Sequence, residues 1–539
     1  MKTSKLKERP HGAAIGRWSA ILLITAGMQT LVLPRLQAAA ANKEITDSGI
    51  TSAVERELRI EKGVSPDSID ASTSQGITTL SGSVDNLLAK ERAVKIAESI
   101  RGVCGVIDRI TVTPVSRPDK DIRKDILTVL KQDPATESYQ VAVSVQDAVA
   151  TLTGSVGSYA EKQLAARIAK GIKGVKEVRN DVTINYLAKR TDPEIASDIK
   201  SRLQWDIWIN GGLVNPVVKD GKVTLTGTIG SAISKWRAFE DAFVNGVASV
   251  DDSGLKIKPL AGKGAQRESE DVISSDSEIK QAVQAALRLD PRVSAFSPDV
   301  TVEDGGVILG GNVGNLKAKT SAEQDAKNIM GVWRVDNLLK VRPNGRRTDA
   351  EMEKQLKAAL SWDPWLDSST IDVAVINRTA YLSGGVESRF EKTEAQDVAS
   401  RIKGVVLVRN HLKVEPDFSA YYQGWPEYSY YGWPDYSYYD WPYNYGWPYS
   451  TGSAYYDPAM YGPQPYLSDE QIKKNIEDKF FWSPFVDRDD VKDTVHGGVA
   501  TLTGTVGTWI GWSEADKDAR KGGATAVLNR VTVNKGHWW

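Results

Sequence analysis

The sequence predicts an α+β protein of six small tandem repeats, each with the order helix, strand, strand, helix, strand. A motif of alternating apolar residues, of which Val149-Ala-Thr-Leu-Thr-Gly-Ser-Val156 is one copy, occurs six times at wide spacing. An amphipathic helical pattern precedes each copy, and an alanine-rich helical pattern follows it. Because 539 residues are too many for one core, this repetition sets the number of domains.

The first helix of each repeat has clear start and stop signals. In repeat two, Ile122, Ile126, Val129 and Leu130 recur at helical spacing. Capping boxes, in which a hydroxyl and a Glu or Gln three residues later satisfy free backbone donors, occur at Thr191/Glu194, Ser275/Glu278, Thr348/Glu351 and Ser468/Gln471. We expect the helix to stop at Asp133, Asp290, Asp363 or Ser483, because each precedes a proline.

Two strands follow and form a predicted hairpin, as in Val141 to Val145 and Ala150 to Val156. By alternation, the glycine of the motif faces the core with the leucine two residues before it. A buried strand glycine indicates that another backbone approaches closely, and the second helix is the candidate. The alternative is a turn glycine that ends the hairpin strand. Under both interpretations these glycines are structural: Gly82, Gly154, Gly227, Gly311, Gly384 and Gly504.

The second helix carries alanines one turn apart, such as Ala165 and Ala169, which let it lie close to the sheet. A Gly-Val turn and a third strand close the repeat, as from Gly174 to Ile184. The turn glycines are Gly102, Gly174, Gly246, Gly331, Gly404 and Gly523. The alanine pairs of repeats three and six are displaced by one residue, so we expect these two repeats to be the least regular.

The predicted repeats span 46–115, 118–186, 191–259, 275–343, 348–414 and 467–535. Residues 260–274 form a polar linker, and residues 415–466 are an insert rich in Tyr, Trp and Pro that is too poor in aliphatic residues to build a core. Repeats of about 70 residues have only marginal cores, so we expect neighbours to pack on one another.

Residues 1–41 have the pattern of an export signal. Basic residues precede the apolar run from Trp18 to Leu33, and small residues permit cleavage near Ala40 or Ala41. The sequence therefore predicts a periplasmic protein. The alternative is an uncleaved segment that anchors the chain in the inner membrane.

No catalytic or metal-binding pattern is present in the sequence. The histidines are His11, His411, His496 and His537, and none has a His or Cys at metal-ligand spacing. The formal net charge of −1 gives no general attraction to nucleic acid. We expect no enzymatic activity, no cofactor and no nucleic-acid partner, and the oligomeric state is left open. The single cysteine, Cys104, excludes an intramolecular disulfide, and its valine neighbours predict a packed thiol.

Two surfaces of the repeats are candidates for membrane or ligand contact. The second helix of repeat two carries Lys162, Arg167, Lys170 and Lys173, which suit lipid phosphates at about 1 kcal/mol per basic group. The alternative is an ordinary solvated helix face. Tryptophans flank the turn after the first helix in three repeats, as the pairs Trp205/Trp208 and Trp362/Trp365 and the single Trp482. One of each pair is expected in the core, and an exposed partner would suit a membrane interface.

The aromatic insert is the third candidate. It contains Trp425, Trp433, Trp441 and Trp447, and it has no Lys or Arg, which argues against single-stranded nucleic acid as its ligand. Stacking on sugar rings, seating in lipid headgroups, association with a second aromatic segment and a plain spacer role all remain open.

The combination of D-x-x-I/L, D-P, D-G-x-V-x-L-x-G-x-V, A-x-x-I-A and G-V-x-x-V-x-N resembles the BON domain family of osmotically inducible periplasmic and other bacterial envelope proteins. The resemblance implies αββαβ domains with two helices on a three-stranded sheet, export, and phospholipid binding without shared catalytic residues. The leading hypothesis is a non-enzymatic envelope protein that binds phospholipid surfaces in envelope maintenance or osmotic stress. The alternative is a periplasmic scaffold or chaperone that binds proteins or cell-wall glycan through the insert.

Overall fold

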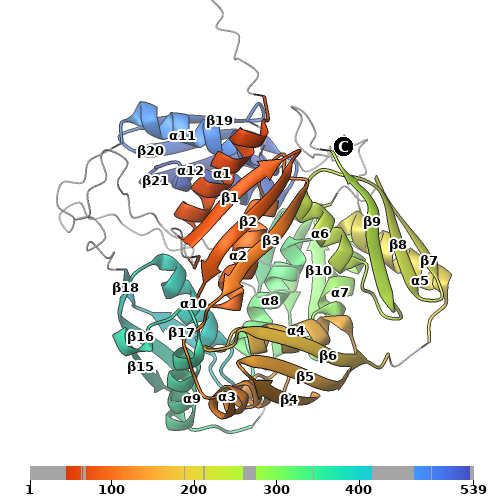
Figure 1. The fold of residues 1–539 in the computed structure, drawn as a ribbon, viewed down its shortest axis with the longest axis vertical. Coiled ribbons are helices and arrows are strands. Elements are labelled where there is room, and N and C mark those ends of the chain that lie inside the picture. Colours follow the sequence, from red (N-terminus) through yellow and green to blue (C-terminus); the bar gives the residue numbers. More distant parts are fainter. Residues whose placement is uncertain are drawn as a thin grey trace, which may run out of the picture. The chain divides into compact units, whose positions relative to one another are not determined.

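The computed structural model describes residues 44–533 except 62, 65–67, 187–188, 210–212, 259–274, 344, 415–466 and 487. Six copies of one α+β unit follow each other in this part of the chain (Figure 1). The predicted signal 1–41, the linker 260–274 and the aromatic insert lie outside the described residues. All contacts between repeats reported below lie within the unit that begins at Ile45.

The first three repeats have five elements each. Repeat one has α1 Asp47–Ile60, β1 Ile69–Ser74, β2 Ile77–Val84, α2 Leu87–Glu98 and β3 Gly105–Val112. Repeat two has α3 Asp119–Gln132, β4 Gln140–Gln146, β5 Val149–Val156, α4 Tyr159–Lys170 and β6 Glu177–Ile184. Repeat three has α5 Asp192–Trp205, β7 Val214–Lys219, β8 Lys222–Ile229, α6 Ala232–Asp241 and β9 Ser249–Ile257.

The last three repeats follow the same order. Repeat four has α7 Asp276–Leu289, β10 Asp299–Glu303, β11 Gly306–Gly310, β12 Asn312–Val313, α8 Leu316–Lys327, β13 Arg334–Asn337 and β14 Lys340–Val341. Repeat five has α9 Asp349–Trp362, β15 Ile371–Ile376, β16 Thr379–Val386, α10 Arg389–Ser400, β17 Leu407–Asn410 and β18 Lys413–Val414. Repeat six has α11 Asp469–Trp482, β19 Val491–His496, β20 Val499–Val506, α12 Trp509–Lys521 and β21 Ala526–Val533.

The second strand is the centre of each sheet. It pairs antiparallel with the first strand and parallel with the third, as where Leu152 of β5 faces Val143 of β4 and Asn180 of β6. Repeat three has a register shift between Thr224 and Thr226, which confirms its expected irregularity. Repeat six pairs without a shift, whereas strands are interrupted in repeats four and five, so the expectation for repeat six was wrong.

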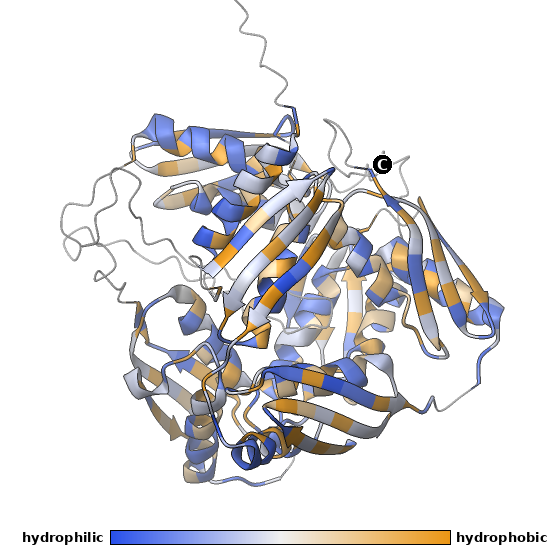
Figure 2. Ribbon diagram, in the orientation of Figure 1, coloured by the Kyte–Doolittle hydropathy of each residue, from blue (hydrophilic) through white to orange (hydrophobic). Residues whose placement is uncertain are grey.

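The helices of each repeat cover one face of its sheet. Apolar and polar residues alternate along the strands, as Figure 2 shows, and the motif leucine is fully buried in every repeat, as at Leu152. The paired alanines of the second helices are also fully buried, as at Ala165 and Ala169, so these helices lie close to the sheet as predicted. The four capping boxes are present as well.

The first residue of each first helix clamps the turn of the hairpin. In repeat two, the carboxylate of Asp119 accepts hydrogen bonds of 2.9 Å from the backbone N–H groups of Asp147 and Ala148. The same pair of bonds is made by Asp47, Asp192, Asp276, Asp349 and Asp469. This clamp joins helix and hairpin about 28 residues apart in all six repeats, and no motif in the sequence predicted it.

The interpretation of the motif glycine as a buried residue beneath the second helix was wrong. Gly154 is exposed and has φ +122°, and a Cβ atom there would lie 2.0 Å from the backbone oxygen of Gln140 on the neighbouring strand. The close backbone therefore belongs to the hairpin partner and not to the second helix. All twelve predicted structural glycines have a positive φ, which L side chains rarely adopt. The expectation for Cys104 was also wrong, because this side chain is exposed.

Candidate functional site

The second helices are buried on the side that faces away from their own sheets. In α8, Lys317, Ser321 and Asp325 are at most 4% exposed, although they do not belong to the apolar core face. A lone repeat would leave this helix face to solvent. The repeats therefore pack on one another through their second helices.

One contact between repeats occurs three times. In repeats three, five and six a tryptophan ends the first helix, and its backbone oxygen accepts a hydrogen bond from another repeat. The donor is the residue just before the turn glycine in repeats four, two and one. The bonds are Met330 N–H to Trp205 (2.8 Å), Lys173 N–H to Trp362 (2.8 Å) and Arg101 N–H to Trp482 (2.9 Å). Repeats are thus paired as 3 with 4, 5 with 2, and 6 with 1.

The residues that follow the first helix make a second set of contacts. Trp365 Nε1 donates to the Gly63 oxygen at 3.1 Å, which joins repeats five and one. Trp208 packs edge-on against Phe485 at a centroid distance of 4.8 Å, which joins repeats three and six. The Arg292 guanidinium donates twice to the Asp133 carboxylate at 3.1 and 3.2 Å, which joins repeats four and two. The two sets together form a closed circuit of repeats 1, 6, 3, 4, 2 and 5.

Further contacts tie repeats one to three together and repeats four to six together. Tyr159 stacks on Phe243 at 3.7 Å between repeats two and three. Lys317 Nζ lies 2.7 Å from Asp397 Oδ1 between repeats four and five, and both side chains are at most 1% exposed. Burial of this ion pair requires that the two helices α8 and α10 stay in contact.

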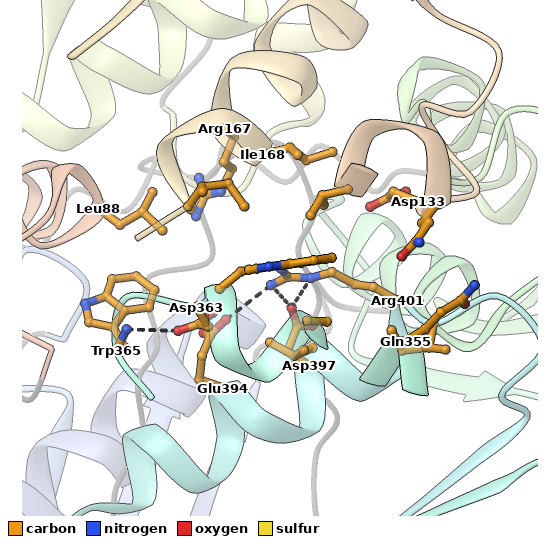
Figure 3. Close-up of a pocket in the computed structure, with 18 of the residues that line it drawn as sticks. Leu88, Asp133, Arg167, Ile168, Gln355, Asp363, Trp365, Glu394, Asp397 and Arg401 are labelled. Atoms are coloured by element: carbon orange, nitrogen blue, oxygen red, sulfur yellow. Dashed lines mark hydrogen bonds and ion pairs between the residues drawn. The ribbon is translucent and has the colours of Figure 1, made fainter. Parts of the chain in front are cut away.

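A cavity of about 120 Å³ lies where repeats one, two and five meet (Figure 3). Leu88, Ile168, Trp365 and Phe390 are among its apolar lining residues. Figure 3 shows the Arg401 guanidinium lying along the cavity and pointing to the carboxylates of α10. The cavity is therefore lined by apolar and charged groups from all three repeats, with most of the charged groups in repeat five.

The charged groups around this cavity satisfy one another. Arg401 Nε donates to Asp397 at 2.8 Å, and its guanidinium also lies 3.3 Å from Glu394. Burial raises the pKa of Glu394 well above its usual range, and the nearby Asp363 raises it further. Burial also opposes ionisation of Asp397, but Arg401 and Lys317 outweigh it and lower the pKa of Asp397. The two cations thus favour the ionised form of Asp397, whereas burial favours the protonated form of Glu394.

The arrangement is suited to holding repeats together. Its cations and carboxylates are used in contacts with each other, and burial makes such pairs specific to one geometry. Among the described residues, no three or more His, Cys, Asp or Glu side chains are placed to hold a metal ion.

The predicted basic face of repeat two takes part in contacts between repeats. Lys170 forms an ion pair with Glu91 of repeat one, and Lys173 Nζ donates to the Leu366 oxygen of repeat five at 2.7 Å. Arg167 lines the cavity, and Lys162 is half-buried on α4. The structure thus gives these residues internal partners, and lipid contact by them stays a prediction that the contacts argue against.

The predicted tryptophans flanking the first turn are also found between repeats. All four are half-buried, so none of them is fully buried in a core. Trp205 packs against the core of repeat four and Trp362 against that of repeat two. Trp208 and Trp365 make the contacts given above. Trp425, Trp433, Trp441 and Trp447 lie outside the described residues, so their role stays a prediction.

The fold and these contacts define a tandem-repeat α+β protein whose repeats are packed into one body. The chain belongs to the BON domain family, since the model of this domain matches residues 46–114, 118–186, 191–259, 275–343, 348–416 and 468–535. This match confirms the resemblance and the fold class predicted from the sequence.

Individual relatives match parts of the chain. Osmotically-inducible protein Y of Escherichia coli (strain K12) is 34% identical over 143 residues, which are 25% of this chain and 71% of that protein. Among solved structures, the chain is similar to CdsD, a structural protein of the Type III secretion system of Chlamydia trachomatis. That similarity has 15% identity and a TM-score of 0.11, and it covers 37% of this chain and 88% of CdsD. In the part of the chain that the structure describes, no helix has the length and apolar character needed to cross a membrane.

Proposed function

We propose that this is a non-enzymatic periplasmic protein that acts in the response to osmotic stress and binds phospholipid membrane surfaces. The observation that carries the proposal is the set of six BON domains, together with the similarity to osmotically-inducible protein Y. The export pattern of residues 1–41 supports the location.

The outer faces of the sheets are the surfaces that support membrane contact best. The second helices are used between repeats, whereas the outer sheet faces carry large apolar side chains in the open. Ile107, Leu407 and Leu528 are 44, 39 and 49% exposed, and an arginine follows each of them two residues later on the same strand face. An exposed aliphatic group beside a cation suits the boundary between lipid headgroups and acyl chains.

Vesicle flotation tests the membrane part of this proposal. The mature chain should float with vesicles that contain phosphatidylglycerol at low salt, and the bound fraction should fall as salt rises, because exposed charges are screened. Absence of binding to such vesicles at low salt would refute it. The physiological part is tested by growth of a strain without this protein after an osmotic upshift, where unchanged recovery would contradict the stress role.

A further inference from the structure

The outer sheet face of repeat six is basic. Alternation places Lys492, Thr494 and His496 of β19 on this face, and all three are exposed. On β21 it carries Ala526, Leu528, Arg530 and Thr532, which are also exposed. The outward residues of the central strand β20 are Val499, Thr501, Thr503 and Thr505. These outward positions of the three strands contain no acidic residue.

Two cations face outward at the same level of this sheet. Thr503 of β20 pairs with Lys492 on one side and with Arg530 on the other, so the cations flank it on the two outer strands. Because strands lie about 4.8 Å apart, their backbones at this level are separated by about 10 Å. Neither side chain forms an ion pair with a carboxylate among the described residues.

Repeat two provides a matched comparison at the same level. Its motif glycine pairs as that of repeat six does, with Val141 of β4 in place of Val491 of β19. The residues that correspond to Lys492, Thr503 and Arg530 are therefore Ala142, Thr153 and Asp181. The two folds are the same, but the charge of the face is opposite.

An apolar group lies next to the two cations. Leu528 is 49% exposed and precedes Arg530 by two residues on the same strand face. A large exposed aliphatic side chain gives no advantage with a fully hydrated anionic polymer, whereas it can enter the acyl boundary of a bilayer while the cations contact phosphates. The aromatic insert 415–466 directly precedes this repeat in the sequence.

We infer that the outer sheet face of repeat six, defined by Lys492, Leu528 and Arg530, docks on an anionic phospholipid bilayer. This inference rests on the proposed function and assigns its contact surface. The corresponding face of repeat two carries Glu177 and Asp181 against Arg179 alone, so it is less suited to an anionic surface. The six repeats therefore do not face the bilayer alike, and repeat six is better suited to it than repeat two.

An exchange of residues between repeats six and two tests the inference in the full mature chain. The variant K492A/R530D installs the residues of repeat two on the face of repeat six, and A142K/D181R does the reverse. At about 1 kcal/mol per unit charge near an anionic surface, the first variant should bind phosphatidylglycerol vesicles roughly 100-fold more weakly at low salt. The reverse variant should bind at least as tightly as the parent. L528D should also weaken binding. Because all these positions are on outer sheet faces, thermal unfolding should match the parent.

The possible outcomes separate this inference from the proposed function. If the parent chain binds no vesicles, the proposed function fails. If the parent binds and K492A/R530D binds equally well, the proposed function stands and the assignment to repeat six is overturned. A third outcome is that the parent binds no vesicles but is retained on heparin, and that K492A/R530D loses this retention. The face would then bind an anionic polymer, and the inference would also be overturned.

Discussion

The buried ion pair between repeats four and five gives the sharpest test of how the repeats pack. Lys317 of α8 and Asp397 of α10 are 0 and 1% exposed, and the charged atoms lie 2.7 Å apart. Asp397 also accepts a hydrogen bond of 2.8 Å from Arg401 Nε. The two partners are therefore not equivalent, because the carboxylate serves two cations.

This asymmetry sets the size of each expected effect. Asp397→Asn takes the shared carboxylate away from two cations, and loss of one partner of a buried ion pair costs about 3–5 kcal/mol. Lys317→Met leaves Asp397 with Arg401, so it should cost only a hydrogen bond to a charged group, about 1.5–3 kcal/mol. A control in repeat five is Lys357→Met, because the Lys357 side chain is 57% exposed in its pair with Glu353. An exposed pair of this kind contributes less than about 1 kcal/mol.

Urea unfolding followed by tryptophan fluorescence measures these differences. The midpoint of the first transition is the quantity to compare, because a chain of several domains need not unfold in two states. The expected order of stability is parent and Lys357→Met, then Lys317→Met, then Asp397→Asn. Equal midpoints for Asp397→Asn and Lys357→Met would refute the reasoning, since the carboxylate would then be solvated and the two repeats would not be packed as described.

Three further results are expected. Gly154→Ala should destabilise repeat two by about 2 kcal/mol or more because of its positive φ, whereas Gly157→Ala, where the new Cβ meets its nearest atom at 3.3 Å, should be nearly neutral; equal thermal midpoints would contradict this. Cys104 should be labelled by a thiol reagent in the native protein because its side chain is exposed, but more slowly than in denaturant, because partial burial and the nearby Asp47 raise its pKa; absence of native labelling would contradict this. Burial raises the pKa of Asp290 to about 6 and that of Asp325 well above its usual range. The folded state then binds more protons than the unfolded state, so the contribution of Asp290 to stability is complete below about pH 4 and declines as the pH rises through about 6, and that of Asp325 changes in the same direction. Asp325→Asn should flatten this decline in a series of thermal midpoints, and an unchanged slope would contradict it.

The sequence predicted the repeat accurately because its signals are local. Capping boxes and proline stops act within a few residues, and alternation predicts the hairpin. The clamp by Asp119 was missed because its partners lie in a turn about 28 residues away. An acidic residue in the first turn of a helix is also common for another reason, its favourable interaction with the helix dipole. Parity also misplaced Gly154, because a positive φ turns the chain out of regular alternation.

The contacts among repeats could not be predicted in the same way. Lys170 and Lys173 have the spacing that is also typical of lysines on a solvated basic helix face. Only the positions of the neighbouring repeats show that these two lysines contact other repeats. A signal was nevertheless present, since a tryptophan ends the first helix only in repeats three, five and six. The partner of each tryptophan depends on which repeats contact one another, and the residues that determine those contacts are spread over all six repeats.

The pairing of repeats 6 with 1, 5 with 2, and 3 with 4 determines the order in which the protein is completed. Arg101 and its acceptor Ser483 are separated by 382 residues, so their contact closes only after the residues between them have been synthesised. Closure of a flexible loop of this length costs about 5 kcal/mol, but the cost is divided when the inner pairs 3 with 4 and 5 with 2 form first. Repeats one and two already contact each other through the ion pair of Lys170 with Glu91, so part of their helix faces is covered before repeat six is made. We expect the middle pair to form early and the contact between repeats one and six to form last.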